Sequence, residues 1–71
     1  MHEYLIANGF RVTMEGQGLT VYRKQITQSG HVTFFVDQNS FVLHSGEKLW
    51  ERKTAKAARN QLYNYGLVEE R

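Results

Sequence analysis

Residues 54–67, with the sequence TAKAARNQLYNYGL, decide the fold. Thr54 is a good N-cap residue for the alanine-rich segment that follows it. Apolar residues then recur at spacings that form one stripe along an α-helix, namely Ala55, Ala58, Leu62 and Tyr65. Gly66 suits the left-handed conformation that ends many helices, and Leu67 can make the hydrophobic contact that accompanies such an end. This pattern predicts a helix over residues 55–65 that buries its apolar stripe.

The sequence before this helix predicts β-strands. Segments rich in Val, Thr, Phe and Tyr, or with alternating apolar and polar residues, occupy positions 10–15, 19–26, 31–37 and 41–44. Glycine or short polar residues separate them, as expected for reversals of the chain. Ser45-Gly46 leaves two possibilities open, a hairpin turn into a further strand at 48–52 or the start of a longer helix. We favour the strand because Thr54 already caps the helix.

Residues 3–7 predict a short first helix that ends at Asn8-Gly9, with Tyr4, Leu5 and Ile6 on its buried side. Residues 68–71 are expected to be loose. The order of elements therefore predicts one small α+β domain over residues 1–71. It has a short N-terminal helix, an antiparallel sheet of three to five strands, and a C-terminal helix packed on one face.

Composition narrows the classes of function. A chain of 71 residues has little room for both a core and a deep pocket, so function should lie on its surface. The absence of cysteine excludes disulfides and thiolate metal sites, and the three histidines show no metal-ligand spacing. We expect no metal and no cofactor. Without an apolar run that could cross a bilayer or a signal-peptide core, we expect a cytoplasmic protein that does not bind membranes.

The sequence contains no self-sufficient catalytic motif, so we do not expect an enzyme. Ser45 and Lys48 have the spacing of a Ser-x-x-Lys nucleophile but lack its partners. Gly16-Gln17-Gly18 lacks the lysine of a phosphate-binding loop. The enzymatic alternative is a ribonuclease that uses His31 or His44 as a general acid or base.

The start of the C-terminal helix is basic. Four cations and no acid occur between positions 52 and 59, namely Arg52, Lys53, Lys56 and Arg59. If the apolar stripe is buried, these side chains and Tyr63 lie on or beside the opposite face, where cations can match a row of phosphates and an aromatic ring can stack. The alternative without a binding function is a solvated helix face that carries charge for solubility. Cations at this end oppose the helix dipole, which favours the binding interpretation.

Two further cations, Arg23 and Lys24, lie in the predicted strand over 19–26. One face of the sheet could therefore extend the basic surface. The alternative is an ordinary edge strand that is protected by its charge.

The order of elements and the segment Arg52-Lys53-Thr54-Ala55-Lys56 resemble the double-stranded-RNA-binding domain, which has a Lys-Lys-x-Ala-Lys signature at its last helix. The resemblance implies that Arg52, Lys53 and Lys56 bind phosphates. It also implies that His31, which follows Gly30, and Glu3 approach a minor groove.

The chain also resembles the HicA-type toxins, which are small ribonucleases of similar fold. The likeness rests on Asn8-Gly9-Phe10, on Tyr22-Arg23-Lys24 after the glycine turn, and on the ending Gly66-Leu67. That family has its catalytic histidine just after the glycine turn, where this chain has Leu19-Thr20. The resemblance therefore implies the fold without the ribonuclease activity.

Two functions from different classes follow. The first is binding of nucleic acid, RNA rather than DNA, through the basic C-terminal helix. The second is binding to a protein target, as a small phage- or plasmid-type inhibitor or regulator. In the second case, the aromatic residues would form the contact, and the chain could also form a homodimer through a sheet edge.

Overall fold

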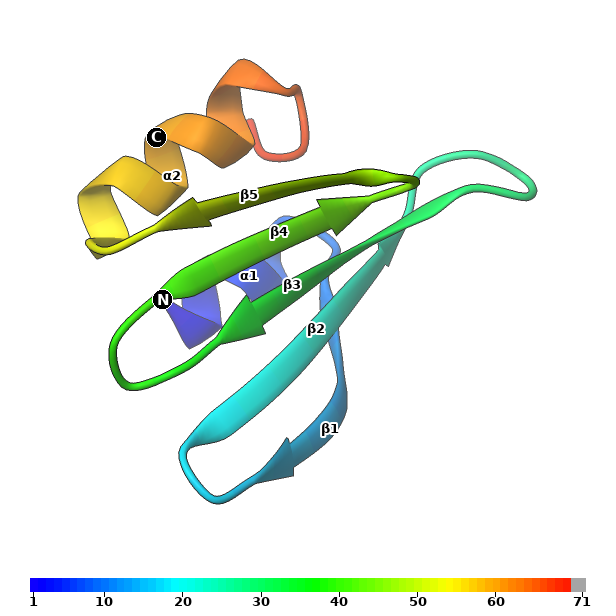
Figure 1. The fold of residues 1–71 in the computed structure, drawn as a ribbon. Helices are drawn as coiled ribbons and strands as arrows, with labels where there is room; N and C mark the ends of the chain where they lie inside the picture. The colour runs from blue at the N-terminus through cyan, green and yellow to red at the C-terminus, as the bar shows by residue number, and fades with distance from the viewer. Residues whose placement is uncertain (70–71) are drawn as a thin grey trace.

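The computed structural model describes residues 1–69 and confirms a single small α+β domain (Figure 1). Seven elements follow one another along the chain: α1 (His2–Ala7), β1 (Arg11–Gly16), β2 (Leu19–Gln25), β3 (His31–Val36), β4 (Phe41–Ser45), β5 (Lys48–Arg52) and α2 (Ala55–Asn64). The strand expected after Ser45-Gly46 is therefore present as β5. Within the described residues, no helix is long and apolar enough to cross a membrane.

The five strands form one antiparallel sheet in the order β1-β2-β3-β4-β5, so each strand pairs with its neighbours in sequence. The β1–β2 turn has positive φ at both central residues, 50° at Gln17 and 80° at Gly18. This conformation matches the twist of the flanking strands and explains the glycine there. β1 and β5 are the two edges. Because β2 lies inside the sheet, its cations do not protect an edge, as one interpretation of Arg23 and Lys24 had supposed.

Both helices cover the same face of the sheet. Figure 1 shows α1 behind the central strands and α2 along β5. The core between them is formed by Leu5 of α1, Ala58 and Leu62 of α2, and strand residues that include Tyr22, Val32, Phe34 and Leu43. Strand register places Tyr22, Phe34 and Leu43 opposite one another, so this face is apolar across β2, β3 and β4. The prediction of a C-terminal helix packed on one face is thus confirmed.

Local sequence signals set the ends of α2. The Thr54 hydroxyl accepts a hydrogen bond from the backbone N–H of Ala57 at 3.2 Å, as an N-cap does. At the other end, Gly66 has φ 72° and its N–H donates to the carbonyl of Tyr63 at 3.0 Å. The N–H of Leu67 donates to the carbonyl of Leu62 at 2.9 Å. This pair of backbone hydrogen bonds is the Schellman motif, which satisfies the last carbonyls of a helix.

Several burial predictions are wrong. Ile6 and Tyr65 are 44% and 48% exposed, and Ala55 is exposed too, because the short helices turn only their central residues to the core. The alternation over residues 10–15 would place Met14 on the same side as Phe10 and Val12, but a β-bulge between Val12 and Met14 moves it to the other face of the sheet. Met14 is 57% exposed there, and every residue of the edge strand β1 is exposed.

The chain after α2 is better ordered than expected over the residues that the structure describes. Val68 is 5% exposed and belongs to the core rather than to a loose tail. The backbone N–H of Glu69 donates to the side-chain oxygen of Asn8 at 3.0 Å. The segment therefore closes the core beside α1. Residues 70–71 of the expected tail lie outside the described residues.

The hydroxyl of Tyr22 makes the stability of the fold sensitive to alkaline pH. Burial raises the pKa of its hydroxyl, and the carboxylate of Glu15 raises it further. Because the pKa of Tyr22 is higher in the folded protein than in the unfolded chain, the protonated hydroxyl stabilises the fold. This stability is fully present below the unfolded-state pKa of about 10 and is lost as pH rises through the folded-state pKa. We therefore expect the free energy of unfolding to fall more steeply above about pH 10 in the wild type than in Tyr22→Phe.

Urea unfolding followed by circular dichroism at about pH 9 and about pH 11 measures this difference. At neutral pH the variant should lose only about 0.5–1.5 kcal/mol, since it removes the 2.8 Å contact between the Tyr22 hydroxyl and Nδ1 of His2. Tyr65→Phe, at an exposed ring, is the matched control. Equal alkaline losses in the wild type and in Tyr22→Phe would contradict the assignment.

Candidate nucleic-acid interface

The sheet divides the predicted site residues between two surfaces. Arg52, Lys53, Lys56, Arg59 and Tyr63 lie on or beside α2, whereas Arg23 and His31 lie on the opposite face of the sheet. Side chains alternate along a strand, so the neighbours Arg23 and Lys24 point to opposite faces. The structure therefore does not gather all the predicted residues into one continuous site.

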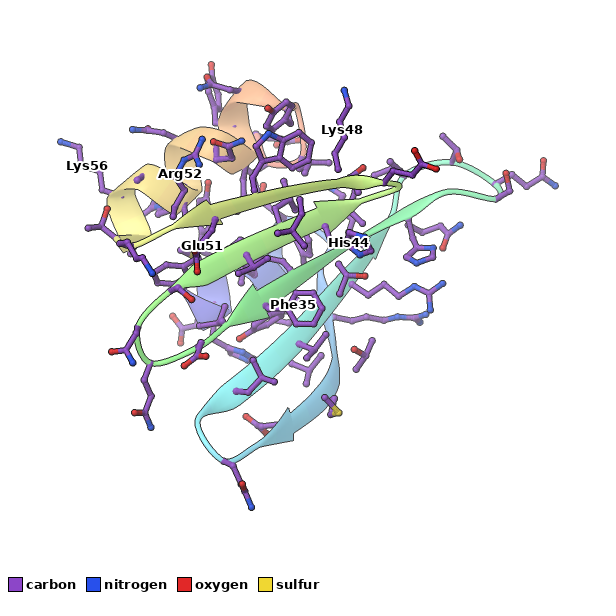
Figure 2. All side chains as sticks on the ribbon, viewed as in Figure 1. Phe35, His44, Lys48, Glu51, Arg52 and Lys56 are labelled. Atoms are coloured by element: carbon purple, nitrogen blue, oxygen red, sulfur yellow. The ribbon has the colours of Figure 1, made fainter. Side chains whose placement is uncertain are left out.

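We call Arg52, Lys53, Lys56 and Arg59 the basic surface. Lys53 and Lys56 are exposed, while Arg52 and Arg59 are partly buried. Lys53 Nζ lies 3.5 Å from a carboxylate oxygen of Glu51, and both side chains are at least half exposed, so this ion pair contributes little to stability. Arg52 Nη1 donates to the backbone carbonyl of Glu51 at 2.7 Å. Figure 2 shows Lys56 extending away from the ribbon at the start of α2.

Arg59 connects the two helices. Its guanidinium carbon lies 4.1 Å from the centre of the Tyr4 ring, in cation–π geometry. Its Nε is buried without a hydrogen-bond acceptor among the described residues. An open hollow beside α2 is lined by Ala55, Lys56, Arg59 and Asn60. Arg59 thus has a packing role, and a ligand at the basic surface would meet only part of its side chain. Tyr63 is 42% exposed on the same helix.

Lys24 has a structural role that its sequence position did not indicate. Its ammonium donates to the backbone carbonyl of Leu67 at 2.7 Å and lies 5.8 Å from the centre of the Phe10 ring. The lysine therefore ties the residue after α2 to the sheet across 43 positions of sequence. This contact holds the ammonium against the chain after α2, so we expect Lys24 to support the fold rather than to bind phosphate.

The face of the sheet turned away from both helices is here called the open face. Two cross-strand rows define it: Arg11, Arg23, Thr33, His44 and Leu49 in the first, and Met14, Val21, Phe35, Val42 and Glu51 in the second. Figure 2 shows Phe35 and His44 on this face, with α1 behind the sheet. Of the residues in these two rows, only Arg23 was predicted from the sequence to belong to the candidate site. The period-two alternation of each strand was the signal that could have grouped the others.

His31 lies on the same side of the sheet, just beyond the first row, and contacts Arg23. Arg23 Nη2 is 3.1 Å from His31 Nδ1, so a neutral His31 accepts this hydrogen bond and carries its proton on Nε2. A hollow beside this pair is lined by residues that include His31, Thr33 and His44. No carboxylate lines it among the described residues. No group of three or more His, Cys, Asp or Glu side chains within residues 1–69 could hold a metal ion.

Comparisons with models of known protein families, with curated proteins and with solved structures give no significant match. What can be said of function therefore rests on the surfaces of this chain. They define a small α+β domain with cations on two separate surfaces, the basic surface and the open face.

Proposed function

We propose that the chain binds nucleic acid, RNA in preference to DNA, through the basic surface on and before α2. The observation that carries the proposal is the absence of any acid in the first turn of α2, next to four cations. Lys53 has only an exposed ion pair, and Lys56 extends into solvent at the helix end whose dipole opposes a cation. A phosphate backbone would offset that unfavourable placement.

The position of the cations also suits a phosphate row. Arg52 ends β5 and Lys56 lies in the first turn of α2, so the two follow one another across the strand-to-helix junction. Phosphates along nucleic acid present a regular series of charges that such a junction can contact. The binding free energy would come mainly from release of counterions, which predicts strong dependence on salt.

Fluorescence anisotropy of labelled RNA at several salt concentrations tests the proposal. Changing Arg52, Lys53 and Lys56 together to Gln should weaken binding about tenfold at low salt. The fall of log K with log salt should also become less steep by about 2 to 3. Arg59 is kept because its contact with Tyr4 supports the fold. Unchanged affinity and slope in the triple variant would refute a phosphate-binding role for this surface.

A matched pair of single variants controls for net charge. Lys56→Gln and Lys48→Gln each remove one exposed lysine, and Figure 2 shows these side chains at opposite ends of β5. A site at the basic surface predicts that only Lys56→Gln changes the salt slope, by about one. Equal changes in both variants would indicate attraction by overall charge alone. A tighter complex with DNA than with RNA would show that the preferred ligand is DNA.

A second candidate function is binding to a protein. The observation that favours it is a small apolar hollow at the end of the sheet near Trp50 and Tyr65, whose rings lie 4.5 Å apart. Ile26 lines the same hollow and is 46% exposed, and Leu49 on edge strand β5 is 65% exposed. This function predicts no salt-sensitive RNA binding in the titration described above, so the same experiment separates the two candidates.

A further inference from the structure

The open face carries an aromatic ring that lies outside the hydrophobic core. Phe35 is only partly buried and lies outside the hydrophobic core to which its neighbour Phe34 belongs. Strand register places it between Val21 and Val42, which flank the ring with aliphatic side chains. The described ring–ring contacts do not include Phe35. An aromatic ring on a rigid central strand is a platform on which a nucleotide base can stack.

Cations border this platform, and within residues 1–69 they have no carboxylate partner. Arg11 and Arg23 lie directly opposite each other in the β1–β2 register, and like charges in that position destabilise a sheet. Arg23 Nε is buried and finds no acceptor among the described residues. Glu51 is the acid of the two cross-strand rows, and its carboxylate contacts Lys53. The row next to Phe35 is therefore positively charged, and an anion placed there would relieve the repulsion between the two arginines.

The charge and the aromatic ring together select the kind of partner. A second copy of the chain docked on this face would bring Arg11 and Arg23 toward cations of the same kind. Single-stranded nucleic acid instead presents phosphates and exposed base faces at the same time. A duplex hides its base faces, so it could not use Phe35. The side chains of His31, Thr33 and His44, which line a hollow on this side of the sheet, supply hydrogen-bonding groups that could contact a ribose 2′-hydroxyl.

We propose that the open face is a binding site for single-stranded RNA, in which a base stacks on Phe35 and phosphates contact Arg11 and Arg23. This inference rests on the proposed nucleic-acid-binding function and assigns its ligand as unpaired RNA. The basic surface and the open face then contact different parts of one strand. Such a strand would pass from one surface to the other around edge strand β5.

The test uses anisotropy with a 5′-labelled 12-nucleotide RNA without secondary structure, the DNA of the same sequence and a 12-base-pair RNA duplex, roughly the size that one small domain covers. Phe35→Leu keeps an apolar side chain while it removes the aromatic face, so the fold should persist. We expect it to weaken binding of single-stranded RNA about tenfold, and to leave duplex binding within about twofold of the wild type. Phe35→Tyr should retain wild-type affinity.

Arg11→Gln with Arg23→Gln should make the dependence of log K on log salt less steep by about 1.4 for single-stranded RNA. The inference is overturned if Phe35→Leu binds that RNA as tightly as the wild type, or if the duplex or the DNA binds more tightly than the single-stranded RNA. If these variants bind RNA as the wild type does while the triple variant of the basic surface loses binding, the proposed function stands and only the open-face site fails. If the wild type binds no probe at low salt, both fail.

Discussion

Replacing Phe34 with alanine should lower the free energy of unfolding by about 3–5 kcal/mol, the range for a large aromatic residue removed from a core. Phe34 is 2% exposed, and its ring centre lies 6.3 Å from that of Phe10 and 6.2 Å from that of Phe41. A domain of this length has a total stability of about 4–10 kcal/mol, so this loss removes a large part of it and should move the urea midpoint to a much lower concentration. Urea unfolding monitored by circular dichroism measures the loss.

Phe35→Ala is the matched control for this variant. It makes the same chemical change one residue further along β3, on the open face, where the ring is only partly buried. We expect a loss below about 1.5 kcal/mol, because less apolar surface returns to water and no closed cavity forms. Equal losses at the two positions would show that the open face is packed in solution, for example in a dimer, and would argue against a free RNA site there.

These two phenylalanines also show what could be predicted from the sequence. The five strands, the turn at Ser45-Gly46 and both ends of α2 depend on local signals such as the Thr54 cap and the Gly66 conformation, and local signals are present in the sequence itself. Which of Phe34 and Phe35 faces the helices depends on how the strands pair and where the helices dock. Both depend on contacts between residues that are far apart in the sequence, which local sequence signals do not specify.

The candidate site shows the same division. The cations of the basic surface share one short segment, so their closeness in sequence was enough to group them. Arg11, Phe35 and His44 come from three different strands and meet only through the cross-strand register, so sequence analysis did not group them. The bulge between Val12 and Met14 adds one residue to β1 and shifts its alternation, which no simple period-two pattern predicts.

Lys24 is the clearest case of a residue whose role depends on a long-range contact. Its neighbour Gly9 has φ 92°, and a Cβ at that position would lie 3.4 Å from Lys24 Cε. A Cβ at this distance would be in ordinary contact, so the positive φ rather than the lysine favours glycine here, and the lysine stem lies beside the backbone after α1. The ammonium then reaches the carbonyl of Leu67, where the chain leaves α2. One side chain therefore joins the sheet to the segments that follow both helices.

We expect Lys24→Met to lower the free energy of unfolding by about 1.5–3 kcal/mol, the range for a hydrogen bond that involves a charged group. Methionine keeps an unbranched stem of similar length but leaves the Leu67 carbonyl without its donor, and it also removes the cation near the Phe10 ring. Arg23→Met is the control from the opposite face. Its exposed contact with His31 should contribute less than about 1 kcal/mol.

The same pair of variants should give the reverse order in RNA binding. At a temperature where both are folded, Lys24→Met should bind RNA within about twofold of the wild type, because its charge belongs to the fold, whereas Arg23→Met should bind more weakly. Urea unfolding and anisotropy on one preparation of each protein provide both readouts. A Lys24→Met variant of wild-type stability with reduced RNA affinity would return Lys24 to the binding site and contradict the structural role that its contact with Leu67 assigns.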